Sequence, residues 1–211
     1  MEAEFWDGRY GRTEYVYGQA PNVFIAAASQ RYLPKPLSLV VELASGEGRN
    51  VVFLAQKGHH VHAVDFSQVG LDKTLQLAMK AGVAGHVSLH CADVTTWQPP
   101  QGSETAQAVI MSFCHIAPDA KRSFFANLVT MLAPGGYLLL ETFRPDQRLQ
   151  GYKSGGPHDP GMMFSLHELR QLLRPYPGQE LEGEELDYML HEGAYHEGMG
   201  AVVRFVWQKA Q

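Results

Sequence analysis

A glycine-punctuated turn after an apolar strand constrains this chain more than any other feature. Residues 40–43 form a short apolar run that contains one acid, Glu42, and Gly46 and Gly48 follow before the helical pattern of residues 51–56. Because glycine has no Cβ, such a turn lets a ligand approach the backbone closely. Free N–H groups at the start of the following helix point toward that ligand. The pattern therefore predicts a binding site over the turn.

Two acidic side chains define what this site could bind. Glu42 lies near the end of its strand and can bind an amine or another cation. A second apolar run, residues 61–64, ends at Asp65, whose carboxylate can accept hydrogen bonds from two sugar hydroxyls. Two strand ends that each carry an acid, with a glycine turn between them, predict a nucleoside site.

Three cofactor types compete for such a site. A dinucleotide-binding turn needs G-x-G-x-x-G, but Val51 stands where the third glycine would be. A P-loop needs a lysine directly after its last glycine, whereas Arg49 follows Gly48. Both alternatives are disfavoured, and S-adenosylmethionine is the third.

Several segments resemble the class I methyltransferases, whose first motif is [D/E]-x-x-x-G-x-G. Glu42, Gly46 and Gly48 match that motif, although Ala44 replaces a glycine often found there. Residues 91–94 resemble the segment along the adenine edge, and residues 132–138 resemble the L-x-P-G-G-x-L entry to the fifth strand. The resemblance implies S-adenosyl-L-methionine as cofactor, with Asp65 as the ribose acid. The cofactor-binding residues expected from it are Glu42, Ala44, Ser45, Gly46, Gly48, Asn50, Asp65, Phe66, Ser67, Ala92, Asp93, Val94 and Ser112.

Composition indicates one globular enzyme domain over residues 1–211, of which 45% are hydrophobic and 18% charged. A net charge of −5 without a lysine/arginine cluster argues against nucleic acid as a partner. No apolar run approaches the ~20 residues of a membrane span, and the first residues do not resemble a signal peptide. We therefore expect a cytoplasmic protein, a monomer or weak homodimer, with no membrane partner. Cys91 and Cys114 should end strands about 14 Å apart, too far for a disulfide, and both are expected to be free thiols.

Strand and helix patterns alternate along the chain. Strands are expected over 37–43, 60–65, 87–91, 106–113, 137–143, 181–190 and 201–209, and helices over 22–32, 48–57, 67–80, 119–132 and 165–173. This alternation predicts an α/β fold with a doubly wound, mostly parallel, seven-stranded sheet and right-handed crossovers. The last two strands should form an antiparallel hairpin.

The carboxyl ends of the parallel strands are where ligands bind in such sheets. His115 follows the fourth strand and is the candidate catalytic residue, because neutral imidazole is available near its usual pKa of about 6.5. A packing role for His115 is equally open. Arg144 could grip an acceptor or pair with Glu141, and a solvated hairpin tip is favoured for Tyr195 and His196.

No metal site is expected. His59, His60 and His62 lie at the start of a strand, away from the ligand-binding edge, and they lack the spacing of a zinc site.

The segment before the sheet is rich in aromatic residues. Residues 1–36 should form a lid and a helix ahead of a core over 37–211, and the lid and substrate candidates are Trp6, Arg9, Tyr10, Tyr15, Tyr17, Arg144 and Tyr195. A plain packing arm is the alternative. The pattern W-D-x-R-Y…E-Y-x-Y-G-x-x-P-N resembles small bacterial methyltransferases of the tellurite-resistance and thiopurine type, which implies that the segment covers the site. A second mobile cover is expected at residues 151–161.

These observations predict methyl transfer from S-adenosylmethionine to a small-molecule acceptor. No strong base arrangement is apparent, so a soft nucleophile is favoured: a thiol, or a reduced selenium or tellurium species, as the resemblance also implies. A nucleic-acid methylase is a rival, but its [N/D]-P-P-[Y/F] motif is replaced by residues 112–115, Ser-Phe-Cys-His. A non-catalytic cofactor-binding module that acts through a partner is the other rival.

Overall fold

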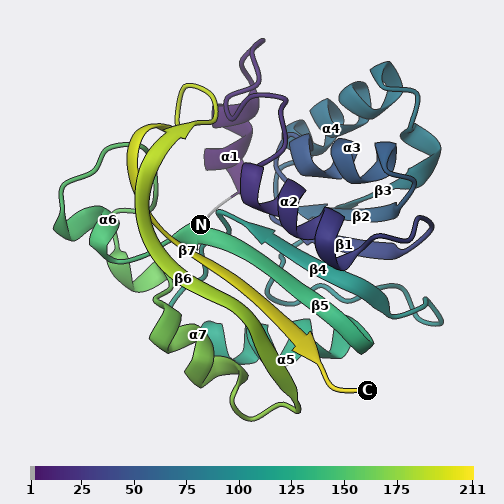
Figure 1. Cartoon of the computed structure of the whole chain (residues 1–211). Helices are drawn as coiled ribbons and strands as arrows, with labels where there is room; N and C mark the ends of the chain where they lie inside the picture. The colour runs from purple at the N-terminus through teal and green to yellow at the C-terminus, as the bar shows by residue number, and fades with distance from the viewer. Residues whose placement is uncertain (1–2) are drawn as a thin grey trace.

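The structure, a computed structural model, describes residues 3–211, so Met1 and Glu2 of the expected lid lie outside the described residues. Its centre is a seven-stranded sheet in the order β3-β2-β1-β4-β5-β7-β6. This order and the helices on both faces confirm the predicted doubly wound α/β fold (Figure 1).

The first five strands run parallel to one another, and the seventh strand runs antiparallel to both of its neighbours, the fifth and the sixth. The strands are β1 (Leu39–Leu43), β2 (His60–Asp65), β3 (Val87–Cys91), β4 (Ala106–Ser112), β5 (Leu132–Phe143), β6 (Gly178–His191) and β7 (Glu197–Lys209). The predicted hairpin is therefore present, with β7 between β5 and the edge strand β6.

Helices cover both faces of the sheet. One face carries α2 (Val23–Tyr32), α3 (Arg49–Gln56) and α4 (Gln68–Lys80), and the other carries α5 (Lys121–Met131) and α7 (Leu166–Leu173) (Figure 1). Three of these helices begin at an N-cap, because the side chains of Asn22, Ser67 and Ser165 each accept a hydrogen bond from the backbone N–H three residues later. Two short 3₁₀ turns, Ala84–His86 and Pro160–Met162, and the one-turn helix α6 (Asp146–Leu149) complete the connections.

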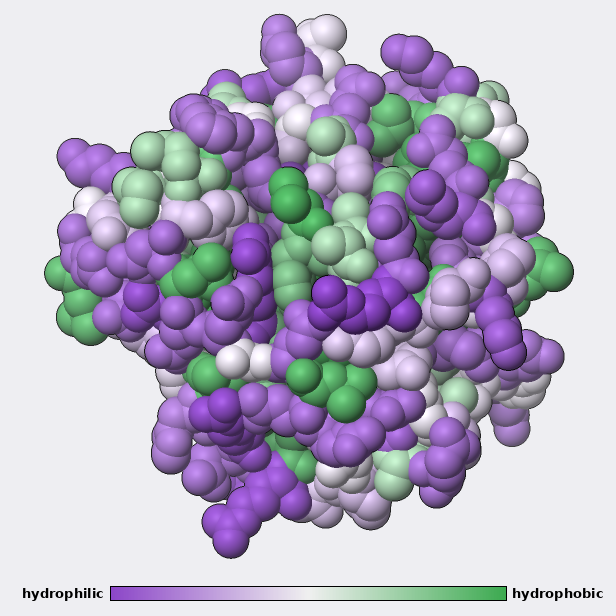
Figure 2. Space-filling view, in the orientation of Figure 1, coloured by the Kyte–Doolittle hydropathy of each residue, from purple (hydrophilic) through white to green (hydrophobic). Residues whose placement is uncertain are grey.

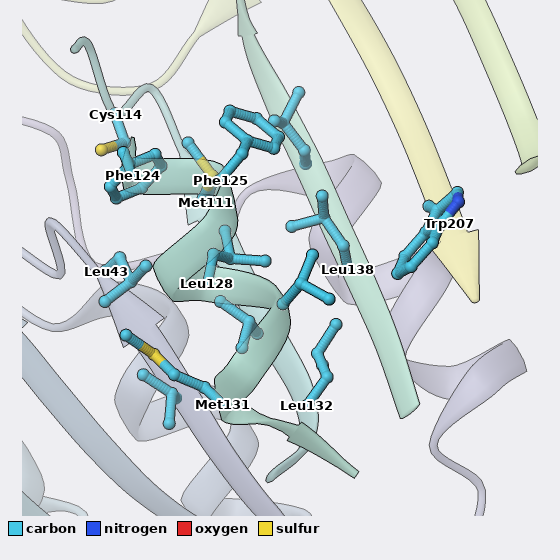
Figure 3. Packing of buried hydrophobic residues seen from close by; sticks show 14 of the residues in the cluster. Leu43, Met111, Cys114, Phe124, Phe125, Leu128, Met131, Leu132, Leu138 and Trp207 are labelled. Carbon is cyan, nitrogen blue, oxygen red and sulfur yellow. The ribbon is translucent and has the colours of Figure 1, made fainter. Parts of the chain in front are cut away.

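The larger hydrophobic core lies between the sheet and α5. Phe124, Phe125 and Leu128 of α5 are buried against Leu138 of β5 and Met111 of β4 (Figure 3). Trp207 of β7 extends this layer toward the hairpin. This packing holds the carboxyl ends of β4 and β5 in fixed positions, and the site is built there.

Several strand ends differ from the sequence expectation: β1 begins at Leu39, β6 at Gly178 and β7 at Glu197. Two differences are larger. The fifth strand begins at Leu132 and not at residue 137, because Leu132 already pairs with Ala106 before the register shifts. Residues 3–10 form a helix, α1, that periodicity did not predict. Its Trp6 and Tyr10 stack one turn apart, with ring centroids separated by 5.5 Å, and the helix packs on α4. Tertiary contact therefore supports α1 where its weak sequence pattern does not.

On the face shown in Figure 2, hydrophilic residues predominate and hydrophobic residues form small separate patches. Over residues 3–211 no helix has the length and apolar character needed to cross a membrane. Cys91 is exposed and Cys114 is buried, and both are free thiols as predicted.

Candidate functional site

A cavity of about 810 Å³ opens at the carboxyl ends of the parallel strands, the edge that the topology predicts for a ligand. This volume lies within the range of small-molecule sites. All the predicted cofactor-binding residues line the cavity except Ser67 and Ala92. Ser67 caps α4 next to the cavity wall, and Ala92 lies just before the lining residues Asp93 and Val94.

The glycine turn forms the floor of the cavity. Gly46 and Gly48 have φ values of 54° and 84°, a conformation that side chains disfavour. A Cβ on Gly46 would lie 2.9 Å from the Tyr10 hydroxyl, and a Cβ on Gly48 would lie 2.5 Å from Cγ2 of Thr74. Both positions therefore need glycine for conformation and for space.

Asp65 sits at the end of β2 with its carboxylate held in place. Oδ2 accepts a hydrogen bond of 2.7 Å from Gly46 N–H, and Oδ1 accepts one of 2.9 Å from Ser67 N–H. Burial raises the pKa of Asp65, and the two N–H donors counteract that effect. Because an ionised carboxylate offers about four lone-pair sites, Asp65 keeps capacity for two more donors.

Glu42 is buried at the end of β1 with half of its carboxylate unpaired. Oε1 accepts a 2.8 Å hydrogen bond from the Asn50 side chain, whereas Oε2 has no partner within the described residues. Burial raises the pKa of Glu42 from 4.5 to about 7, despite the opposing effects of Asn50 and Arg49. The hydroxyls of Ser45 and Ser112 also line the cavity, and both are buried and unpaired. Such orphaned polar atoms indicate a polar ligand, because buried groups of this kind otherwise cost free energy.

The other end of the cavity is aromatic. Phe113 follows β4 with a φ of 52°, unusual for a bulky residue, and its ring lies 4.7 Å from Phe143 and 4.2 Å from His196. His115 stacks in parallel on Phe143 and lines the same wall. Burial, and then the neighbouring His196 and two cations, lower the pKa of His115 to about 3. His115 is therefore a neutral imidazole at physiological pH and a weak proton acceptor.

The amino-terminal arm, residues 3–18, closes one side of the cavity. Asp7 accepts a hydrogen bond from the Ser67 hydroxyl at the start of α4, and Val16 N–H donates to the Glu47 carboxylate in the glycine turn. Trp6, Arg9, Tyr10 and Tyr17 line the cavity as predicted for a lid. Tyr15 does not, because its hydroxyl bonds to the Lys73 carbonyl on the outside of α4.

Two further lid candidates also lie away from the cavity. Arg144 forms ion pairs with Asp146 and Asp187, so its guanidinium does not face the cavity and the expected grip on an acceptor is not formed. Its predicted partner Glu141 instead pairs with Arg204 on β7. Tyr195 does not line the cavity, although its ring stacks under the Arg9 guanidinium of the arm.

The expected solvated hairpin tip is wrong for His196, which is only 5% exposed and lines the cavity. The β6–β7 hairpin curves over the sheet so that its tip lies beside α1 (Figure 1). A Cβ on Gly193 in this tip would lie 2.5 Å from the Val16 carbonyl oxygen. The glycine therefore permits the arm and the hairpin tip to meet backbone to backbone.

The predicted second cover also contributes to the cavity. Residues 156–159 line it, and a Cβ on Gly155 would lie 2.8 Å from Cδ2 of His196. Three segments distant in the sequence, namely the arm, this loop and the hairpin tip, thus enclose the aromatic end.

Sequence reasoning missed the charged residues that join these segments. Arg49, at the start of α3, donates to the Tyr17 carbonyl and pairs with Glu192 at 2.8 Å. Asn22 donates to both Glu192 and Glu141. The sequence did contain a signal for these contacts: Glu47 and Arg49 lie within the glycine turn, and buried charges in such a turn need partners nearby.

The histidines of β2 pair with histidines in β3 and in the 3₁₀ turn before it. His62 and His90 share a 2.9 Å hydrogen bond and stack, and His60 stacks on His86. Within residues 3–211 no group of three or more histidine, cysteine or acidic side chains is placed to hold a metal ion.

Residues 40–136 match the family model of a methyltransferase domain. This region, just under half of the chain, is therefore similar to a methyltransferase domain. The chain is 26% identical over 147 residues to probable thiol methyltransferase 2 of Arabidopsis thaliana, an alignment that covers 70% of this chain and 62% of that protein.

Two solved structures illustrate the fold. TehB from Haemophilus influenzae superposes with a TM-score of 0.69 and 17% identity, covering 98% of this chain and 66% of that one. The N-methyltransferase NodS from Bradyrhizobium japonicum in complex with S-adenosyl-L-homocysteine superposes with a TM-score of 0.70 and 14% identity, covering 99% of this chain and 98% of that one. The chain thus spans less than two-thirds of the curated relative and of the TehB structure. The predicted resemblance to class I methyltransferases is confirmed.

Proposed function

We propose that this protein transfers a methyl group from S-adenosyl-L-methionine to a small molecule. The observation that carries the proposal is the set of buried, unpaired oxygens of Glu42, Ser45 and Ser112 beside the glycine turn. They face one cavity that also contains Asp65, and NodS binds S-adenosyl-L-homocysteine on the same fold. When bound, the cofactor supplies a methyl group activated on a sulfonium.

Each part of the cofactor has a matching group in the cavity. Asp65 would accept hydrogen bonds from the ribose hydroxyls, Glu42 would bind the amino group, and Asp93 and Val94 would lie along the adenine edge. The aromatic end would then receive the methyl group and the acceptor. Its rings favour a cationic sulfonium and exclude water, which otherwise competes for the methyl group.

The acceptor that best fits this end is a small, soft nucleophile such as a thiol or a reduced selenium or tellurium species. A thiolate needs little beyond alignment with the methyl carbon at about 3–3.5 Å. The likeness to a probable thiol methyltransferase supports this choice. In this proposal His115, the catalytic candidate, orients the acceptor as a neutral imidazole, and the arm over residues 3–18 acts as the lid. Free thiols at Cys91 and Cys114 are consistent with the cytoplasm as its location.

Calorimetric titration with S-adenosyl-L-homocysteine tests the proposal. Hydrogen bonds to a charged group contribute roughly 1.5–3 kcal/mol each. Asp65→Ala should therefore weaken binding tenfold or more, since about 1.4 kcal/mol corresponds to one decade. Asp65→Asn serves as the matched control for size, and Asp93→Asn reports on the adenine edge. No binding by the wild type, or equal affinity in Asp65→Ala, would contradict the assignment.

A further inference from the structure

His196 is a buried imidazole to which the proposed methyl transfer assigns no role. It is 5% exposed, and its ring lies within 4.5 Å of Tyr17 and 4.2 Å of Phe113, measured between centroids. The hairpin turn fixes its backbone, because Glu192 N–H donates to the His196 carbonyl and His196 N–H donates to Gly193. The side chain is thus held at the aromatic end of the cavity.

Glu192 lies behind this imidazole as a buried carboxylate. Its Oε2 is 2.8 Å from the Arg49 guanidinium and 3.6 Å from Nδ1 of His196, and its Oε1 accepts a hydrogen bond from Asn22. Burial alone would raise the pKa of Glu192, but His196 and Arg49 lower it, so the carboxylate is ionised. An ionised carboxylate beside Nδ1 favours the tautomer that carries its proton on Nδ1 and leaves Nε2 as an acceptor.

We propose that His196, positioned by Glu192, accepts the proton of a protonated acceptor during methyl transfer. This inference rests on the proposed function and extends it to acceptors that arrive as neutral thiols. The acceptor sulfur loses its proton to Nε2 and forms a bond to the methyl carbon. The electron pair of the broken methyl–sulfonium bond stays on the cofactor's sulfur, and the imidazolium later releases its proton to water.

His196 suits this role better than its neighbour His115. Within residues 3–211 the Nδ1 atoms of both rings are buried without a hydrogen-bond partner inside 3.5 Å. His196 differs in that the Glu192 carboxylate lies 3.6 Å from its Nδ1, close enough to orient the ring after a small shift. The charged and titratable groups around His196 are Glu192, Arg49, Arg9, Tyr17 and His115. Burial lowers the pKa of His196 and Glu192 counteracts this effect, so the imidazole is neutral at pH 7. The 3.6 Å contact is long, as such contacts often are before substrate binds.

Nitrogen NMR of histidine-labelled protein tests the pair without turnover. The His196 signals are assigned by comparison with His196→Gln, and wild type should show a proton on Nδ1 and a free Nε2. Glu192→Gln, a matched neutral variant, should lower the pKa of His196 further, because it removes the carboxylate that stabilises the imidazolium. A proton on Nε2 in wild type, or an unchanged pKa in Glu192→Gln, would overturn the proposal.

Kinetic measurements with two thiols distinguish a proton-accepting role of His196 from a packing role. An aliphatic thiol is largely protonated at pH 7, as free cysteine is with a pKa near 8.5, whereas a nitro-substituted aromatic thiol is already ionised. His196→Gln should reduce kcat for the aliphatic thiol about 10²–10⁴-fold, the usual cost of losing a general base. It should reduce kcat for the aromatic thiol less than about tenfold. Glu192→Gln should shift the rising limb of the pH–rate profile for the aliphatic thiol to lower pH.

The outcomes distinguish this inference from the proposed function. Equal losses for both thiols would make His196 a wall residue and overturn the inference, while methyl transfer itself would stand. Absence of S-adenosyl-L-homocysteine binding by wild type would instead remove the proposed function. Retained binding of that ligand by His196→Gln shows that the variant is folded. If neither thiol is methylated, the NMR measurement still decides whether the pair exists.

Discussion

Replacing Glu42 by glutamine should stabilise the empty protein at neutral pH while weakening ligand binding. Burial raises the pKa of Glu42 from 4.5 to about 7, so the folded protein binds this proton more tightly than the unfolded chain does. The contribution of protonated Glu42 to the free energy of unfolding is fully present below about pH 4.5, and it is lost as the pH rises through about 7. Above that pH the full cost of a buried, half-paired carboxylate is present.

The size of the effect follows from the same pKa values. A change from 4.5 to about 7 corresponds to about 3 kcal/mol, at about 1.4 kcal/mol for each pH unit. Glutamine has the same shape and no charge, so it avoids this cost. Urea unfolding of wild type and Glu42→Gln at pH 5 and pH 8 measures it. The variant should be more stable by about 1–3 kcal/mol at pH 8, and the difference should shrink at pH 5.

Binding should change in the opposite direction. If Glu42 binds the cofactor's ammonium group, the affinity of wild type for S-adenosyl-L-homocysteine should fall as pH decreases below about 7, and Glu42→Gln should lose that dependence. Glu47→Gln is the matched control, because this buried carboxylate is already paired with Lys73. A variant that is less stable than wild type at pH 8, or that binds the ligand as well as wild type does, would refute the assigned role of Glu42.

Three further predictions concern the cover and the acceptor. Deleting residues 1–18 should leave a folded core, and it should reduce turnover more than it reduces binding of S-adenosyl-L-homocysteine. Normal turnover in the truncated protein would show that the arm only packs against the core. Gly193→Ala should loosen the arm, because its Cβ would meet the Val16 carbonyl at 2.5 Å, and limited proteolysis should then cut the arm faster. Gly82→Ala, also at positive φ but in open space, is the control, and equal proteolysis of both variants would contradict the contact. His115→Ala should reduce methylation of a thiol or selenide only modestly, and a preference for a catechol with a large His115 effect would contradict the soft-nucleophile proposal.

The parallel sheet and the cofactor end were predictable because their signals are local. The strand from Leu39 to Leu43, the turn through Gly48 and the helix after it are contiguous in the chain, and Asp65 ends the next strand. The runs over residues 40–43 and 61–64 are largely buried, so the length of each run and its acid are visible without knowledge of distant contacts. The glycines were informative because their φ values exclude most other residues.

The aromatic end was less predictable because its residues depend on contacts between distant segments. His196 lies in a polar stretch that is typical of an exposed tip, and it is buried only because Gly193 lets the arm pack against that tip. Arg144 follows a strand that ends at the site, yet Asp187 on β6 draws its guanidinium away. Neither partner can be identified from spacing along the chain.

The polar contacts between these segments explain how an acceptor site built from separate loops can have a defined shape. Arg49 joins the start of α3 to both the arm and the hairpin tip, and Asn22 joins Glu192 to the carboxyl end of β5. Because Arg49 directly follows Gly48, a shift of the glycine turn on binding a cofactor would move the partner of Glu192. The Arg49–Glu192 ion pair is buried, and the loss of such a pair leaves an uncompensated charge, so this contact would carry a shift of the turn toward Glu192 and the neighbouring His196 side chain. We therefore expect Arg49→Ala to weaken binding of S-adenosyl-L-homocysteine and to change the pKa of His196 as well, and an effect on only one of the two would contradict this connection.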